Sequence, residues 1–92
     1  MTNNTNNQAP VETLRDGAVF VKIWRRQTAK GAFHTVEVGR TYTDDKGHYQ
    51  TARTFSGSEL LKLNALTTKA YERVRAFDTQ AKQAAAQFKN AA

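Results

Sequence analysis

Between residues 18 and 26 the chain reads Ala-Val-Phe-Val-Lys-Ile-Trp-Arg-Arg, which gives alternate positions two different characters. A β-strand sends successive side chains to opposite faces, so the alternation predicts a strand with unlike faces. One face carries Val19, Val21 and Ile23 and is expected to be core. The other face carries, in order, Phe20, Lys22, Trp24 and Arg26. Its aromatic rings either stack on unpaired bases, with the cations on phosphates, or form a second core layer.

Two further strands are predicted by similar patterns, over residues 33–43 and 48–55. Lys30-Gly31 marks a hairpin loop after the first strand, and Asp44-Asp45-Lys46-Gly47 is a turn before the last one. The three strands form an antiparallel meander. Residues 11–16 offer a fourth, short edge strand through their two apolar positions.

Closing each loop symmetrically predicts which residues face each other. Lys22 then faces Glu37 and Trp24 faces Thr35 in the first hairpin, and Tyr42 faces Tyr49 in the second. A bulge at Gly47 would shift the third strand by one residue and exchange its faces. The predicted apolar face consists of Val19, Val21, Ile23, Val36, Val38 and Phe55. The opposite face consists of Phe20, Lys22, Trp24, Arg26, Phe33, Thr35 and Thr54.

A long helix is predicted after the sheet. Ser56-Gly57-Ser58-Glu59 is a capping box, and neither Gly nor Pro occurs from residue 58 to the end. Beyond Phe77 the stripe of apolar residues along this helix is thin. This part either packs against a partner helix or frays as an Ala-rich end. Apolar residues recur at spacings of three and four at Leu60, Leu63, Ala70, Val74, Phe77, Ala81, Ala84, Phe88 and Ala91.

These elements predict one α+β domain, a three- to four-stranded antiparallel meander followed by one long C-terminal helix. The domain covers residues 11–77, residues 78–92 form a helical extension, and the Asn- and Thr-rich residues 1–10 form a disordered tail. A domain of 92 residues has a thin core, and we expect a homodimer.

The charge balance points to a polyanionic partner. The chain has 14 Lys and Arg against 8 Asp and Glu, a net charge of +6, and no cysteine. No apolar run approaches the ~18 residues that a membrane helix needs, and no signal-type segment begins the chain. We therefore expect a cytoplasmic protein without a membrane contact.

Catalytic patterns are not evident in the sequence. His34 and His48 fall at different ends of the second hairpin, and Asp44 and Asp45 are explained as turn residues. Ser56 is explained by helix capping, without a histidine placed as its base. We expect no enzyme activity, no cofactor and no metal site.

The order of these segments resembles the single-stranded-DNA-binding transcriptional coactivator family, meaning positive cofactor four and its bacterial and phage relatives. The resemblance covers about residues 11–77 and implies a curved four-stranded sheet, one C-terminal helix, a homodimer and basic grooves for single-stranded DNA. The chain departs from the family in a weakly marked first strand and a longer extension from Asp78. The segments that carry the resemblance are Val19-Phe20-Val21-Lys22, Val36-Glu37-Val38-Gly39-Arg40-Thr41-Tyr42, Asp44-Asp45-Lys46-Gly47, Arg53-Thr54-Phe55-Ser56 and Leu60-Leu61-Lys62-Leu63.

Carried over by position, the resemblance implies a binding surface for single-stranded nucleic acid. It places Lys22, Trp24 and Arg26 on the strand that presents basic and aromatic side chains, and Lys30 in a loop that contacts phosphates. It also implies that the second hairpin lines the nucleic-acid-binding groove, with Arg40, Tyr42, Tyr49 and Arg53. The symmetric register sets these four on the face opposite Trp24, which conflicts with a single groove. The alternative function is a protein-interaction module that uses the heptad-patterned helix.

Overall fold

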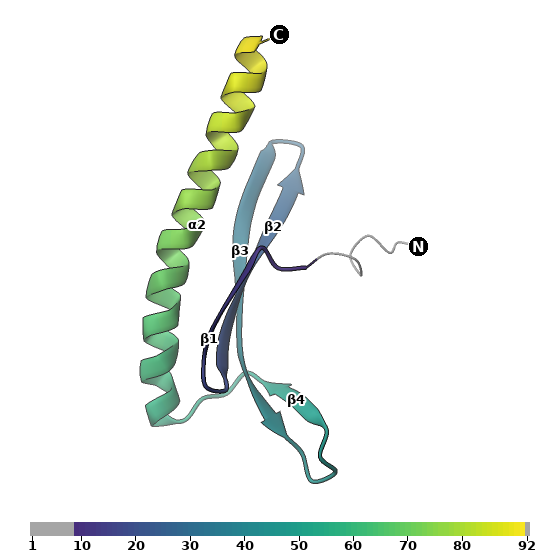
Figure 1. The fold of residues 1–92 in the computed structure, drawn as a ribbon, viewed down its shortest axis with the longest axis vertical. Coiled ribbons are helices and arrows are strands. Elements are labelled where there is room, and N and C mark those ends of the chain that lie inside the picture. The colour runs from purple at the N-terminus through teal and green to yellow at the C-terminus, as the bar shows by residue number, and fades with distance from the viewer. Residues whose placement is uncertain (1–8, 92) are drawn as a thin grey trace.

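The computed structural model describes residues 9–91 of the chain, and the side chains of residues 9–86. One antiparallel sheet, in the order β1-β2-β3-β4, precedes a single long helix (Figure 1). This confirms the α+β fold class, and the edge strand offered by residues 11–16 is the fourth strand. The predicted tail falls, up to residue 8, outside the described residues. The elements are β1 (Glu12–Asp16), β2 (Val19–Thr28), β3 (Gly31–Thr43), β4 (Tyr49–Ala52) and α2 (Gly57–Ala91).

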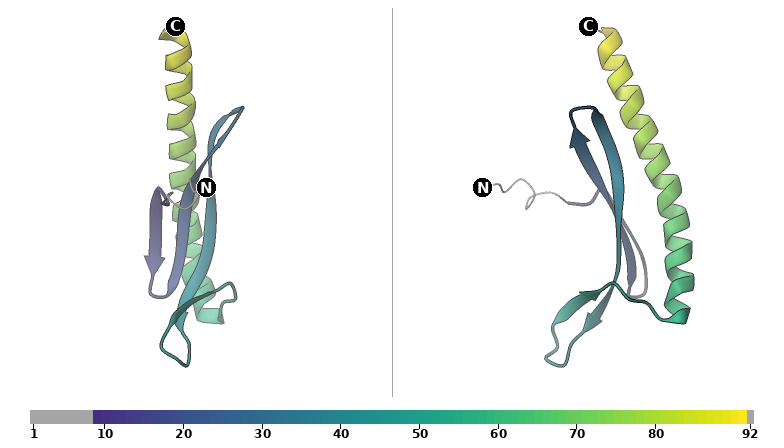
Figure 2. Two further views of the ribbon diagram at one scale, coloured as in Figure 1. Left: turned by 90° about the vertical axis from the view of Figure 1, so that its right-hand side faces the viewer. Right: turned by 180° about the vertical axis from the view of Figure 1, so that it is seen from behind.

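The sheet and the helix form two layers. α2 runs along one face of the sheet, as both views in Figure 2 show, and it contacts β1, β2 and β3. The β3–β4 hairpin bends away from α2 and projects from the body of the molecule (Figure 1). Within residues 9–91, no helix or strand covers the other face of the sheet, which we call the open face. It carries Phe20, Lys22, Trp24 and Arg26 of β2 and their partners on β1 and β3.

The core lies between β2 and α2. Val19, Val21 and Ile23 are fully buried and pack against Leu66 and Ala70 of the helix. This confirms the prediction that alternate residues of the first strand form the core. Partly buried apolar side chains surround this cluster, namely Leu14, Val38, Phe55, Leu63, Val74 and Phe77.

Two residues predicted to be buried are exposed instead. Val36 is 46% exposed, because β4 pairs with β3 only from Arg40 onward and leaves Val36 on a free edge. Leu60 is also exposed, since the stripe of α2 that faces the sheet includes Leu66 and leaves Leu60 on its flank. The helix therefore has a narrower apolar contact with the sheet than the sequence pattern predicted.

The first hairpin has the predicted register. Lys22 faces Glu37 and Trp24 faces Thr35, and the pairing continues to Thr28 opposite Gly31. The loop is therefore shorter than predicted, with only two residues between the strands. Because this hairpin is long and symmetric, it sets the alternation of the whole open face.

The second hairpin has a register one residue away from the symmetric prediction. Tyr49 faces Thr43 instead of Tyr42. The cause is the loop over residues 44–48, in which Gly47 has a positive φ of 81° and its N–H donates to the carbonyl of Asp44 over 3.0 Å. This is the shift that a bulge at Gly47 would produce. The shift places Tyr49 on the same face as Trp24. The strand β4 is also shorter than predicted and ends before Phe55.

The helix begins at the predicted capping box. The Ser56 N–H donates to the Glu59 carboxylate over 2.8 Å, and the Glu59 N–H donates to the Ser56 hydroxyl over 3.4 Å. The backbone hydrogen bond from Ser56 lowers the pKa of Glu59 and outweighs the opposing effect of burial. These reciprocal bonds satisfy donors that a helix start leaves without partners.

The second half of α2 is fixed to β3. His34 Nδ1 lies 2.7 Å from Asp78 Oδ1, and the His34 ring packs on Phe77 with centroids 5.2 Å apart. Ala81, Ala84 and Ala85 then line a shallow groove beside the β2–β3 hairpin. The helix crosses the predicted boundary at residue 78 without a break. The predicted stripe positions 88 and 91 lie outside the described side chains.

Candidate nucleic-acid interface

The open face carries an aromatic and basic row where the sequence predicted one. Lys22, Trp24 and Arg26 follow one another on β2, and each is opposite a residue of β3. Trp24 faces Thr35 and Arg26 faces Phe33, whose ring is exposed. Because α2 lies on the other side of the sheet, this row is accessible from outside the molecule.

The indole of Trp24 is held in place by β3. Its Nε1 donates a hydrogen bond to Glu37 Oε1 over 3.1 Å, and the Arg26 guanidinium lies 5.8 Å from its ring. Arg26 in turn donates from Nε to the Thr35 hydroxyl over 3.2 Å. The second oxygen of Glu37 accepts from Arg53 over 3.1 Å, which joins Trp24 and Arg53 through one carboxylate. The half-buried indole is therefore oriented before any ligand arrives.

Glu37 carries the charge that organises this cluster. Burial acts to raise the pKa of its carboxyl, but hydrogen bonds from Trp24 and Arg53 and the charge of Lys22 outweigh burial and lower it. A carboxylate with a lowered pKa is charged at neutral pH. It therefore stabilises the folded state there and loses this contribution in acid.

We expect Glu37→Gln to lower stability at neutral pH but not in strong acid. The pKa of Glu37 in the folded protein lies below its usual value of 4.5, so its contribution is complete above that pH and is lost as the pH falls through the folded-state pKa. Urea unfolding, followed at neutral pH and in acid, measures the difference between the two proteins. A difference that stays the same at both pH values would contradict this assignment.

Phe20 is not accessible, although it was predicted as a stacking platform. It is only 3% exposed, and its ring lies over Gly39, where an added Cβ would be 2.7 Å from the ring tip. The Arg15 guanidinium and the Lys22 ammonium lie 5.5 and 5.1 Å from its ring. Phe20 therefore forms a small second core on the open face, which is the alternative that the sequence left open.

Three arginines are held by acidic partners. Arg40 Nε lies 3.6 Å from Glu59 and also donates to the Thr54 carbonyl over 2.6 Å. Arg53 is bound to Glu37, and Arg73 on the helix is paired with Glu12 over 2.7 Å. Their charges fasten α2 and β4 to the sheet, so they are less available to a ligand.

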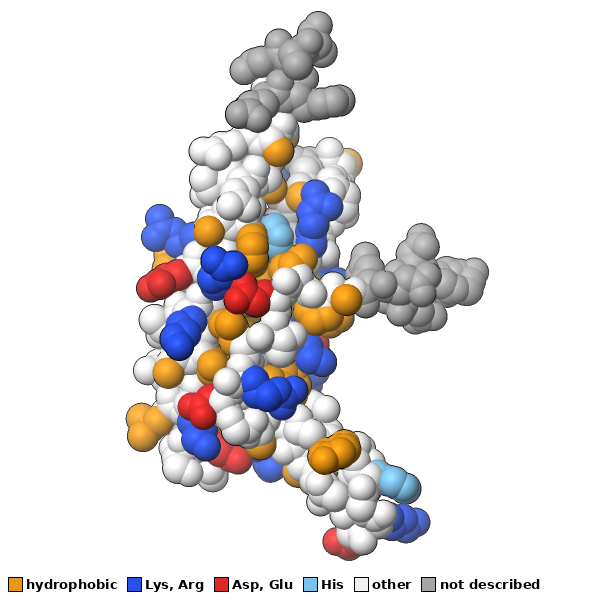
Figure 3. All heavy atoms as spheres, in the orientation of Figure 1, with side chains coloured by type: hydrophobic (Ala, Val, Ile, Leu, Met, Phe, Trp, Pro, Cys, Tyr) orange, Lys and Arg blue, Asp and Glu red, His pale blue; other side chains and the backbone are white. Residues whose placement is uncertain are grey.

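The basic residues of β2 and of the loop that follows it are differently placed. Among the residues with described side chains, no ion pair involves Lys22, Arg25, Arg26 or Lys30. All four belong to β2 or the loop that follows it. Figure 3 shows other basic side chains spread over the helix and mixed with acidic and apolar ones. Lys22 and Arg26 share the face of Trp24, whereas Arg25 alternates onto the α2 side of the sheet, where it lines the groove beside Ala81.

The two predicted tyrosines of the second hairpin lie on opposite faces. Tyr49 is 80% exposed and shares the face of Trp24, which removes the predicted conflict for this residue. Tyr42 and Arg40 remain on the other face, with the guanidinium 5.7 Å from the tyrosine ring. Arg53 reaches the edge of β3, where it donates to the Val38 carbonyl over 2.8 Å.

Two residues of the interface were absent from the predicted site. Phe33 was placed on the correct face but not counted as a site residue, although its position opposite Arg26 extends the aromatic row. Arg15 lies on β1, opposite Phe20, and its guanidinium donates to Thr41 over 3.5 Å. The alternation signal could have found Phe33, whereas Arg15 depended on the weakly marked first strand.

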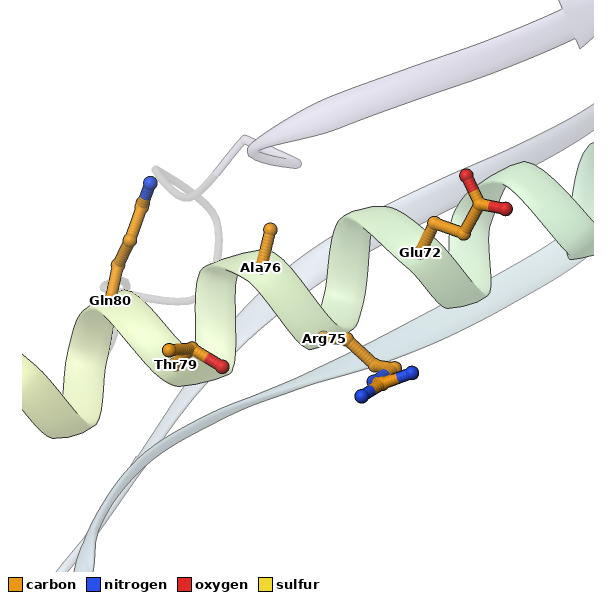
Figure 4. A pocket seen from close by; sticks show the side chains of 5 residues that line it. All are labelled: Glu72, Arg75, Ala76, Thr79 and Gln80. Atoms are coloured by element: carbon orange, nitrogen blue, oxygen red, sulfur yellow. The ribbon is translucent and has the colours of Figure 1, made fainter.

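A shallow hollow along α2 is lined by Glu72, Arg75, Ala76, Thr79 and Gln80, whose side chains point to different sides of the helix (Figure 4). Within the described residues, no group of three or more His, Asp or Glu side chains could hold a metal ion. Over the same residues, no helix is long and apolar enough to cross a membrane.

Compared with known proteins, the chain matches no family model, no curated protein and no solved structure at a significant level.

Proposed function

We propose that this chain is a cytoplasmic, non-enzymatic protein that binds single-stranded nucleic acid, without strict sequence preference, on the open face of its sheet. One observation carries the proposal. Lys22, Trp24 and Arg26 lie on the open face of β2, Lys30 lies in the loop that follows, and none of the three cations takes part in an ion pair of the described residues. Cations for the phosphates and an aromatic ring for a base are the elements that single-strand binding needs.

The arrangement favours a single strand over a duplex. Bases can stack on Trp24 only when their faces are free, and paired bases in a duplex are stacked on each other. The binding role of the resembled coactivator family supports the same proposal.

Removing two cations of the hairpin should reduce the salt dependence of binding. Affinity for single strands falls by about 0.7 log units per phosphate contact for each tenfold rise in salt, so Lys22→Gln/Arg26→Gln should lower the slope by about 1.4. The measurement is fluorescence anisotropy of a labelled oligo-dT over a salt series. Lys69→Gln/Lys82→Gln removes the same charge from exposed helix positions and should leave the slope unchanged. Equal slopes for both double variants would refute a phosphate site on the open face.

A second candidate function is protein–protein contact, including a homodimer as in the resembled family. Leu60, Leu61 and Tyr71 are exposed on α2, and exposed apolar residues of this kind favour a partner. Leu61→Lys/Tyr71→Lys should then shift the sedimentation coefficient toward that of a monomer. The same double variant keeps the open face intact, so its affinity for oligo-dT should equal that of the natural sequence.

A further inference from the structure

The first two strands separate beside Trp24. The regular pairing of β1 and β2 ends with Glu12 opposite Ile23, and the next bond runs from the Val11 N–H to the Ile23 carbonyl over 2.8 Å. This bond is out of step with the ladder by one residue, and Pro10 follows toward the N-terminus. From Trp24 to Thr28, β2 has no partner strand on its β1 side among the described residues.

A slot lies at this separation. It is lined by Ala9, Val11, Trp24, Arg25 and Gln27 and has a volume of about 290 Å³. Its lining includes two apolar groups, the side chain of Val11, which is 45% exposed, and the indole of Trp24. The volume is at the lower limit of ordinary ligand sites, which fits one flat group better than a larger ligand.

The floor of the slot offers backbone hydrogen-bonding groups. In a strand, the N–H and C=O of every second residue point to the same edge, and the Ile23 carbonyl points toward β1. The corresponding groups of Arg25 and Gln27 therefore point to the same edge, where no described strand pairs with them. An unpaired strand edge presents alternating donors and acceptors, as the edge of a nucleobase does.

We propose that this slot receives a single unpaired nucleobase, stacked between Trp24 and Val11 and hydrogen-bonded to the edge of β2 at Arg25 and Gln27. The cationic side chain of Arg25 belongs to the lining of the slot and suits a phosphate next to the base. The inference rests on the proposed function and adds to it one specific base site. It also explains why Trp24 is fixed by Glu37, since an oriented ring forms a constant wall.

The test separates contact with bases from contact with phosphates. The probes are a labelled oligo-dT and a labelled abasic oligomer of equal length and charge, and the measured quantity is the ratio of their dissociation constants. Ala9→Leu/Val11→Leu fills the slot with aliphatic side chains. Ala29→Leu/Val36→Leu adds the same bulk at exposed positions away from the slot and serves as the matched control. Circular dichroism and urea unfolding confirm that both variants are folded.

We expect the natural sequence to prefer oligo-dT over the abasic oligomer by about 5- to 150-fold, the range given by stacking of one base. Filling the slot should reduce this ratio at least fivefold. It should leave affinity for the abasic oligomer unchanged, while the control keeps the full ratio. A folded, slot-filled variant with an unchanged or larger ratio would overturn the slot. If the natural protein binds neither oligomer, the proposed function itself fails, and the slot has no base to receive.

Discussion

Ile23→Ala is expected to lower the free energy of unfolding by about 2–5 kcal/mol. Ile23 is fully buried between β2 and α2, and it is among the largest side chains with no exposed surface. The change removes buried methyl groups and leaves a cavity that neighbouring residues fill only in part. Since domains are usually stable by about 5–15 kcal/mol, a loss of this size is a large share of the total.

The control for Ile23→Ala is its cross-strand neighbour. Val36 faces Ile23 on β3 but is 46% exposed, so Val36→Ala removes similar atoms without opening a buried cavity. Its cost should be below about 1 kcal/mol. Urea unfolding of both variants measures the contrast. Equal losses at the two positions would mean that the core is not centred on β2.

Trp24→Leu is expected to weaken binding to single-stranded oligo-dT by about 5- to 150-fold. The leucine keeps an apolar side chain on the open face but removes the ring on which a base would stack. Anisotropy of a labelled strand measures the loss at fixed salt. Tyr71→Leu removes an exposed aromatic ring from α2 and should leave the affinity unchanged. If Trp24→Leu binds as tightly as the natural sequence, Trp24 is a structural residue only.

The sheet could be predicted wherever local pattern and loop geometry agreed. The two-faced alternation of β2 and the short symmetric loop after it were enough to predict Lys22 opposite Glu37 and Trp24 opposite Thr35, and both pairs are confirmed. The second hairpin was wrong by one residue because Gly47 adopts a positive φ. A glycine in a turn permits that conformation but does not require it, so the sequence alone left both registers open.

The composition of the interface was harder to predict than the fold. Phe20 alternates with core residues and still became buried, because Gly39 leaves room for its ring on the open face. Whether a Lys or Arg side chain is free to bind a ligand depends on acidic residues that are distant in sequence, as the ion pair of Arg73 with Glu12 shows. A count of basic residues cannot separate such structural arginines from those around Trp24. Only the folded arrangement divides the two groups.

The most direct test of the central claim uses Trp24, the only tryptophan of the chain. The protein is titrated with oligo-dT and with a duplex of matched length, at low and at moderate salt, while the fluorescence of Trp24 is followed. The account predicts strong quenching by the single strand, weaker quenching at higher salt, and a smaller effect of the duplex. Unchanged fluorescence with both nucleic acids, together with flat anisotropy of the labelled strands, would contradict binding on the open face.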